Sequence, residues 1–120
     1  MTNDTFVRTG SDPDTIRGAD ICYFSFSRLA KGPLPRGLLP VVPDLVIEVR
    51  SPSDRSGSVD EKINEYIAAG VTVAVLIDPD KGTVAIHRSN ELPQMLNRHD
   101  VLTIPEVLPG FSLPIEQLFV

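Results

Sequence analysis

The pattern of apolar and polar positions predicts one strand above all, over residues 43–50. Leu45, Ile47 and Val49 are all apolar and alternate with other residues. Because side chains alternate between the two faces of a strand, these three share a wholly apolar face. The opposite face carries Val46 and the charged residues Asp44, Glu48 and Arg50. The segment PDLVIEVR is therefore predicted to be a strand with one apolar and one charged face.

The period changes from two to that of a helix over Ser58–Ala69. Ser58 and Glu61 have the spacing of a capping box, in which each side chain accepts a hydrogen bond from a free backbone N–H at the helix start. An apolar stripe at helical spacing follows, formed by Val59, Ile63, Tyr66 and Ile67. Gly70 supplies the left-handed residue that commonly follows a last helical turn. The sequence thus predicts one helix soon after the strand, with Lys62 beside its buried stripe.

Shorter runs predict a sheet around this helix. Val71–Ile77 is rich in β-branched residues, as in a strand that is covered on both faces. A turn at Asp78–Gly82 joins it to a returning strand. The other expected segments are a strand region at Thr15–Phe26, a loop at Ser27–Pro40, strands at Thr83–Arg88 and Val101–Ile104, a loop at Asn90–Pro93 and a helical turn at Ile115–Phe119. We therefore expect an α/β fold, with a mixed α+β sheet of about four to six strands and one central helix.

Length and composition fit a single domain over residues 1–120. The chain has 120 residues, of which 42% are apolar and 22% charged, close to the average for globular proteins. Residues 1–14 are mostly polar, and we expect them to be poorly ordered. The longest apolar runs are far below the ~18–20 residues that span a bilayer, and no secretory signal opens the chain. A cytoplasmic protein with no membrane partner is the expectation.

Charge and motifs exclude several classes of function. The net charge of −5 argues against a strongly basic protein that binds nucleic acid independently of its sequence. Residues 1–60, however, carry 7 basic and 8 acidic side chains, which leaves room for a local positive groove. The single cysteine, Cys22, excludes an intramolecular disulfide and a cysteine zinc site. No phosphate-binding glycine loop and no G-x-S-x-G motif occurs. His87 and His99 lack H-E-x-x-H spacing, so we interpret them as histidines that either have their hydrogen bonds satisfied within the fold or face the solvent.

Three ionic side chains form the candidate site. Glu48 lies inside the apolar string LVIEV, where an isolated carboxylate would be costly if that face were buried. Lys62 lies in the helix that follows this strand, and Asp20 lies in an earlier strand-like segment. Two carboxylates that meet at a sheet edge suit Mg²⁺, which keeps waters and takes a substrate phosphate as a further ligand. The ammonium group of Lys62 would steady an attacking water or the developing negative charge.

The same residues also have a purely structural interpretation. The face with Asp44, Glu48 and Arg50 would then be the wet side of a half-exposed strand, with weak surface ion pairs. Asp20 would be a turn residue, and Lys62 would be a solvated helix lysine. Because periodicity does not show whether Asp20 and Glu48 are neighbours, the spacing leaves both interpretations open.

Three longer strings resemble the Uma2 family, also known as DUF820. They are PDLVIEVRSPSDR, EKINEYIAAGVTVAVLIDPDKGTVAIHR and LPGFSLPIEQLF, and the resemblance runs from about Thr15 to the C-terminus. This family contains restriction-endonuclease-like proteins within the PD-(D/E)XK nuclease superfamily. The resemblance therefore implies a restriction-endonuclease-like core, Mg²⁺ or Mn²⁺ as the cofactor, and hydrolysis of DNA phosphodiester bonds.

The resemblance also implies a role for each candidate residue. IRGADICYF is similar to the family's R-x-PDV strand, with Ala19 in place of the usual proline, so Asp20 is expected to bind metal. VIEVRSPS is similar to the (D/E)-x-K strand, which makes Glu48 the second metal-binding carboxylate. Arg50 stands at the position of the superfamily's catalytic lysine, and Lys62 matches the helix lysine thought to replace it in Uma2 proteins. Because an arginine stays protonated, Arg50 is expected to bind substrate phosphate rather than act as a base.

Two hypotheses follow. The first is a metal-dependent endonuclease in which Asp20, Glu48 and Lys62 are catalytic. The second is a catalytically inactive remnant that acts as an oligomerising or protein-binding module. The second hypothesis rests on Arg50, on the acidic net charge, and on an N-terminal layer that family members carry ahead of Asp20 and that this shortened chain is expected to lack. The resemblance suggests a homodimer in addition to the DNA partner.

Overall fold

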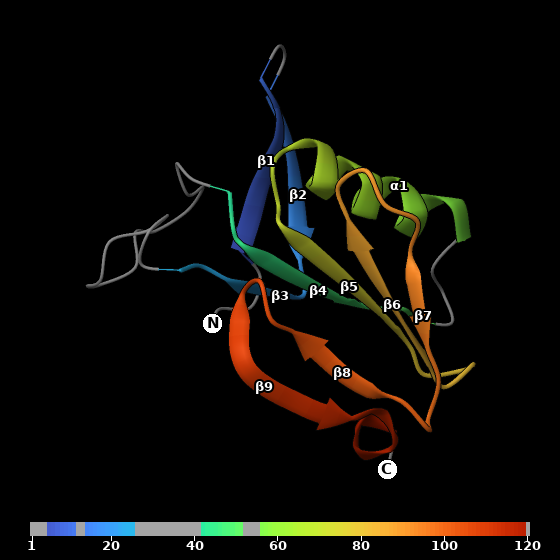
Figure 1. Ribbon diagram of the computed structural model, residues 1–120. Helices are drawn as coiled ribbons and strands as arrows, with labels where there is room; N and C mark the ends of the chain where they lie inside the picture. Colours follow the sequence, from blue (N-terminus) through green and yellow to red (C-terminus); the bar gives the residue numbers. More distant parts are fainter. Residues whose placement is uncertain (1–4, 12–13, 26–41, 52–55, 120) are drawn as a thin grey trace.

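The computed structural model describes residues 5–11, 14–25, 42–51 and 56–119. Within them the elements are β1 (Thr5–Ser11), β2 (Asp14–Ala19), β3 (Ile21–Tyr23), β4 (Leu45–Val49), α1 (Ser56–Ala68), β5 (Val73–Asp78), β6 (Thr83–Arg88), β7 (Gln94–Leu96), β8 (Val101–Ile104), β9 (Leu108–Pro114) and the 3-10 turn η1 (Ile115–Leu118) (Figure 1). The predicted loop at Ser27–Pro40 lies outside the described residues. The structure describes no basic side chain of residues 1–60 other than Arg50, so the suggested positive groove stays a prediction.

A five-stranded mixed sheet forms the centre, in the order β3-β4-β5-β6-β7. β4 and β5 are parallel, whereas the other neighbouring pairs are antiparallel. Parallel neighbours need a crossover connection, and α1 provides it between these two strands (Figure 1). Two hairpins, β1–β2 and β8–β9, pair separately from this sheet. The crossover from β4 to β5 therefore runs through α1.

Two apolar cores lie on the opposite faces of the sheet. On the helix side, Val46, Ala74 and Leu76 pack with residues of α1. On the other side, Leu45, Val73 and Val75 pack with residues from the β8–β9 hairpin and η1. β4 and β5 thus alternate between the two cores, as expected for strands that are covered on both faces. Among the described residues, α1, the five-stranded sheet, and the β8–β9 hairpin with η1 are stacked in this order (Figure 1).

The predicted mixed sheet around one helix is confirmed, and its five strands fall within the expected range. The strands at Thr83–Arg88 and Val101–Ile104 have the predicted limits. Within the segment that was expected to be poorly ordered, Thr5–Ser11 forms β1, which pairs with β2. The strands β7 and β9 also form where the sequence did not predict them.

The ends of α1 differ in how well the sequence predicts them. The helix begins at Ser56, so Ser58 lies within the first turn and the predicted capping box is wrong. At the other end Gly70 has a φ of +110°, as predicted for the residue after the last turn. The N–H of Val71 donates to the carbonyl of Tyr66, and the N–H of Gly70 donates to that of Ile67. These two bonds make a Schellman motif. Within the described chain, no helix is long and apolar enough to cross a membrane.

Candidate active site

Glu48 is an acidic residue in the apolar interior. It lies on β4, opposite Leu76 of β5, on the face that α1 covers. Its exposed fraction is only 5%. The interpretation of this position as the wet side of a half-exposed strand is therefore wrong. Burial removes the hydration of an ionised carboxylate, so its charge needs partners nearby.

Two side chains of α1 are those partners. Lys62 Nζ lies 3.2 Å from Glu48 Oε1 and 3.3 Å from Oε2. The buried hydroxyl of Tyr66 donates a hydrogen bond of 3.0 Å to Oε1. Because Lys62 and Tyr66 are four residues apart, they project from the same side of the helix, one turn from each other. The helix therefore contacts the carboxylate of Glu48 from two positions.

The pKa of Glu48 lies above its ordinary value because the residue is buried. The negative charge of Asp20 raises this pKa further, whereas the charge of Lys62 and the hydrogen bond from Tyr66 oppose the rise. Burial and the charge of Glu48 also raise the pKa of Tyr66, so its phenol stays protonated and can donate. The same two causes raise the pKa of Cys22 to about 11. Cys22 is fully buried, which confirms its prediction as a small packed residue.

Asp20 approaches the same place from the edge strand. Ile21 of β3 lies opposite Ile47 of β4, and one residue further this register sets Asp20 opposite Glu48. Oδ2 of Asp20 accepts a hydrogen bond of 2.8 Å from the backbone N–H of Val49. Its charge is close enough to act on the pKa of Glu48. The structure therefore brings Asp20, Glu48 and Lys62 together, and their catalytic role stays a prediction.

Comparison with known proteins identifies the family of this chain. The Uma2 family model, described as "Putative restriction endonuclease", matches residues 2–116. The chain belongs to the Uma2 family. It is also similar to a solved structure, a "putative nuclease belonging to DUF820" from Anabaena variabilis ATCC 29413, with a TM-score of 0.86 and 25% sequence identity. The similarity covers 98% of this chain and 66% of that one, so this chain spans about two thirds of that protein. A comparison with curated proteins gives no significant match.

The Uma2 match extends further toward the N-terminus than the sequence motifs indicated. The recognised strings begin near Thr15, whereas the family match begins at residue 2 and includes both β1 and β2. The β1–β2 hairpin is therefore part of the Uma2 domain. The close structural similarity also confirms the fold that the resemblance implied.

The side chains of this Uma2 site suit a hard divalent cation. Asp20 and Glu48 offer carboxylate oxygens, and Oδ1 of Asp20 has no hydrogen-bond partner among the described residues. Mg²⁺ in proteins commonly takes one or two carboxylates and completes its shell with waters and a substrate phosphate. Within the described parts of the chain, no cluster of three or more His, Cys, Asp or Glu side chains could hold an ion. Two carboxylates, with Oδ1 of Asp20 open, are what the described residues offer such an ion.

The other two charged residues next to β4 lie away from these contacts. Asp44 precedes the strand, and its Oδ2 accepts a hydrogen bond of 2.6 Å from the backbone N–H of Ser25. Arg50 follows the strand, and its backbone N–H donates to the carbonyl of Ile77 at 2.8 Å. The side chain of Arg50 lines a pocket on the same face as Glu48. Asp44 therefore fixes the entry of β4, and phosphate binding by Arg50 stays a prediction.

Tyr66 is the residue of this site that the sequence analysis did not single out. It was assigned to the apolar stripe of the helix, and its side chain is indeed fully buried. Its hydroxyl, however, bonds to Glu48. A buried tyrosine usually needs a hydrogen-bond partner for its hydroxyl, and Glu48 was the acidic residue on the facing strand. The four-residue spacing of Lys62 and Tyr66 was thus the signal in the sequence that both side chains could reach the same carboxylate.

Proposed function

We propose that this Uma2 protein is a metal-dependent endonuclease that hydrolyses DNA phosphodiester bonds. The observation that carries the proposal is the buried carboxylate of Glu48, 3.2 Å from Lys62 Nζ and across the register from Asp20. A buried ion pair often costs as much in lost hydration as it returns, so fold stability alone is a weak reason for this arrangement. Titratable groups with perturbed pKa values cluster at functional sites. The description of the family as restriction endonucleases supports the same activity.

Each residue has a role in this proposal. Asp20 and Glu48 hold Mg²⁺ or Mn²⁺ through their carboxylate oxygens. Such an ion, when bound, lowers the pKa of a water and neutralises charge on the phosphate. Tyr66 keeps Glu48 in one orientation through its hydrogen bond. The partly exposed ammonium group of Lys62 donates to the attacking water or to the negative charge that develops on the phosphate oxygens.

The substrate and the assembly state belong to the same proposal. Arg50 lies two residues beyond Glu48 on the same face, and we assign it to a substrate phosphate. A guanidinium suits this role because it stays protonated and its planar donors match phosphate oxygens. A homodimer remains an expectation from the family resemblance, and a cytoplasmic location remains an expectation from the sequence.

DNA cleavage by the purified protein tests the proposal. We expect cleavage that requires Mg²⁺ or Mn²⁺, and we expect Glu48→Gln and Lys62→Ala each to reduce it by about a hundredfold or more. The matched control is Glu61→Gln, the same chemical change on the exposed side of α1, which should leave the rate unchanged. Because burial disfavours the charge of Glu48, the neutral amide in Glu48→Gln should keep or raise the melting temperature. Cleavage that survives both site substitutions would reject the proposal.

Titration with Mn²⁺ separates the endonuclease from the inactive module. If both carboxylates form the site, calorimetry should detect Mn²⁺ binding that Asp20→Asn and Glu48→Gln abolish. A folded protein that neither binds Mn²⁺ nor cleaves DNA would instead support a protein-binding or oligomerising module.

A further inference from the structure

A pocket of about 250 Å³ lies on the helix-facing side of the sheet, lined by neighbours of Glu48 but not by Glu48 itself. Leu76 of β5 and Ala85 of β6 line it with apolar surface. Leu76 is also the register partner of Glu48, so the pocket begins on the strand beside the candidate site. Arg50, two residues after Glu48, lines the same pocket. A ligand that extends from Glu48 across this face would therefore enter the pocket.

Two cationic side chains from different elements line the pocket, Arg50 after β4 and Lys81 in the turn between β5 and β6. Lys81 is exposed, and its ammonium group forms no ion pair with any residue that the structure describes. The turn that carries Lys81 is well fixed. Oδ1 of Asp78 accepts hydrogen bonds from the N–H groups of Asp80 at 3.1 Å and of Lys81 at 3.2 Å, and Gly82 has a φ of +64°. The backbone therefore holds Lys81 at the pocket before any ligand arrives.

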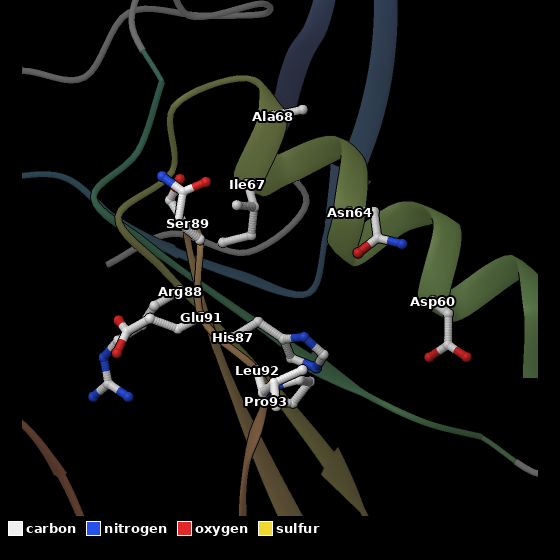
Figure 2. Close-up of a pocket in the computed structure, with 11 residues that line it drawn as sticks. Asp60, Asn64, Ile67, Ala68, His87, Arg88, Ser89, Glu91, Leu92 and Pro93 are labelled. Carbon is white, nitrogen blue, oxygen red and sulfur yellow. The ribbon is translucent and has the colours of Figure 1, made fainter.

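Two acidic side chains, Asp60 and Asp78, also line the pocket. Asp78 bonds within its own turn, and Asp60 lies at the border with a second pocket. The carboxylate of Asp78 is an acceptor within the turn, as described above. Asp60 of α1 lines both this pocket and a wider one of about 920 Å³, so it lies where the two meet. Figure 2 shows Asp60 projecting from the helix at the wider pocket, and His87 projecting from the sheet. Of these two pockets, Arg50 and Lys81 line only the smaller one.

We propose that the smaller pocket binds the nucleotide that flanks the scissile phosphate in the substrate strand. The phosphate of that nucleotide would lie between Arg50 and Lys81, and its sugar or base would cover Leu76 and Ala85. The inference rests on the proposed function, because the reacting phosphate must lie at Glu48 and Lys62 for the neighbouring nucleotide to reach the pocket. The volume is below the ~300–1,000 Å³ of typical ligand pockets, which suits one nucleotide better than a base pair.

Binding of labelled DNA tests the role of Lys81 without any need for cleavage. We compare Lys81→Ala and Lys81→Arg with Arg98→Ala, which removes the same charge from an exposed turn away from the pocket. Fluorescence anisotropy is measured in the Glu48→Gln background at several salt concentrations. Lys81→Ala should weaken binding about three- to tenfold more than Arg98→Ala does, and should lower the slope of log affinity against log salt by about one. Lys81→Arg should retain most of the affinity.

Strand truncation then locates the contact. The oligonucleotide is shortened from one side of the cleavage position, and separately from the other, in the protein with Lys81 and in Lys81→Ala. We expect one truncation to remove the difference between these two proteins, while the other truncation keeps it. Equal losses in Lys81→Ala and Arg98→Ala, or a Lys81 effect that survives both truncations, would overturn the assignment of this pocket while DNA binding itself persists. If the protein neither binds nor cleaves DNA, the proposed function is rejected, and the pocket assignment is rejected with it.

Discussion

The side chain of Tyr66 links the stability of the protein to its candidate chemistry. Its ring fills the core on the helix side, and its hydroxyl donates to the buried carboxylate of Glu48. The hydrogen bond favours the ionised form of Glu48, against the effect of burial. A single hydroxyl group thus acts on the pKa of a carboxylate that the proposed metal site needs in its charged form.

Removal of this hydroxyl should therefore have two measurable effects. Tyr66→Phe leaves Oε1 of Glu48 without one donor, so we expect the free energy of unfolding to fall by about 1–3 kcal/mol in chemical denaturation. The pKa of Glu48 should rise further, which lowers the apparent Mn²⁺ affinity at a given pH. Tyr23→Phe, the same change on the half-buried β3, should alter stability by no more than about 0.5 kcal/mol. Unchanged Mn²⁺ affinity in Tyr66→Phe would mean that this contact does not support the site.

At the scale of single elements, α1 depends on how its last turn closes. The Schellman motif places Gly70 in the left-handed region and brings Val71 back toward Tyr66. Val71 and Tyr66 are both buried in the same core, as is typical of this motif. Because Tyr66 belongs to this last turn and Lys62 precedes it by one turn, the end of the helix also positions the partners of Glu48.

Two glycines of the helix region allow a matched test. A Cβ at either Gly57 or Gly70 would meet no atom within 4 Å, so steric clashes contribute nothing in either place. Gly70→Ala forces an alanine into a φ of +110° and should lower the free energy of unfolding by about 1 kcal/mol or more. Gly57→Ala, within the first turn of α1, should leave stability unchanged or raise it by up to about 1 kcal/mol. Thermal denaturation that shows equal effects would contradict the role of the left-handed turn.

The sequence predicted the elements that have a strong pattern of apolar and polar residues. It missed strands that form only by pairing with a neighbouring strand. β4 alternates cleanly and α1 has a regular stripe, so both were found. β9 contains two prolines and a glycine, which disfavour strands, and it forms by pairing with β8. β7 has only three residues, too few to show a period.

The candidate site shows the same division. Lys62 follows from helical spacing, and Glu48 follows from its unusual place in an apolar strand. The same spacing placed Tyr66 in the buried stripe but did not show that its hydroxyl bonds to Glu48. The position of Asp20 beside Glu48 follows from the pairing of β3 with β4, which brings together residues far apart in the chain. Periodicity holds no information about such a pairing, so only the family resemblance could suggest it.

At the scale of the whole molecule, an ion pair joins the sheet to the layer opposite the helix. Arg88 ends β6, and Glu106 lies between β8 and β9. Arg88 Nε lies 2.9 Å from Glu106 Oε2, and Nη2 lies 3.3 Å from Oε1, so the pair is bidentate. The hydrogen bond from Arg88 lowers the pKa of Glu106 below its ordinary value. Both side chains are partly exposed, so water and salt weaken the pair.

This pair predicts a pH-dependent contribution to stability. The folded pKa of Glu106 is depressed, so its contribution is complete above the unfolded pKa and is lost as the pH falls through the folded one. Glu106→Gln should therefore cost about 0.2–1 kcal/mol at neutral pH and almost nothing near about pH 3. Glu116→Gln, on the exposed side of η1, is the control and should show no such dependence. The measurement is urea unfolding at both pH values, and a cost that persists in acid would contradict the ion-pair explanation.

The edge position of β3 has a consequence for how the site opens. Glu48, Lys62 and Tyr66 all belong to the compact unit of β4, α1 and β5, whereas Asp20 is attached through a three-residue strand and one bond to the backbone of Val49. Sheet edges fray at a lower free-energy cost than central strands. Fraying of β3 would carry Asp20 away while the central strands and the helix stay folded. An ion that bridges Asp20 and Glu48 would hold this edge strand in place. Its binding should therefore slow amide hydrogen exchange in β3 at ion concentrations too low to change the global melting temperature.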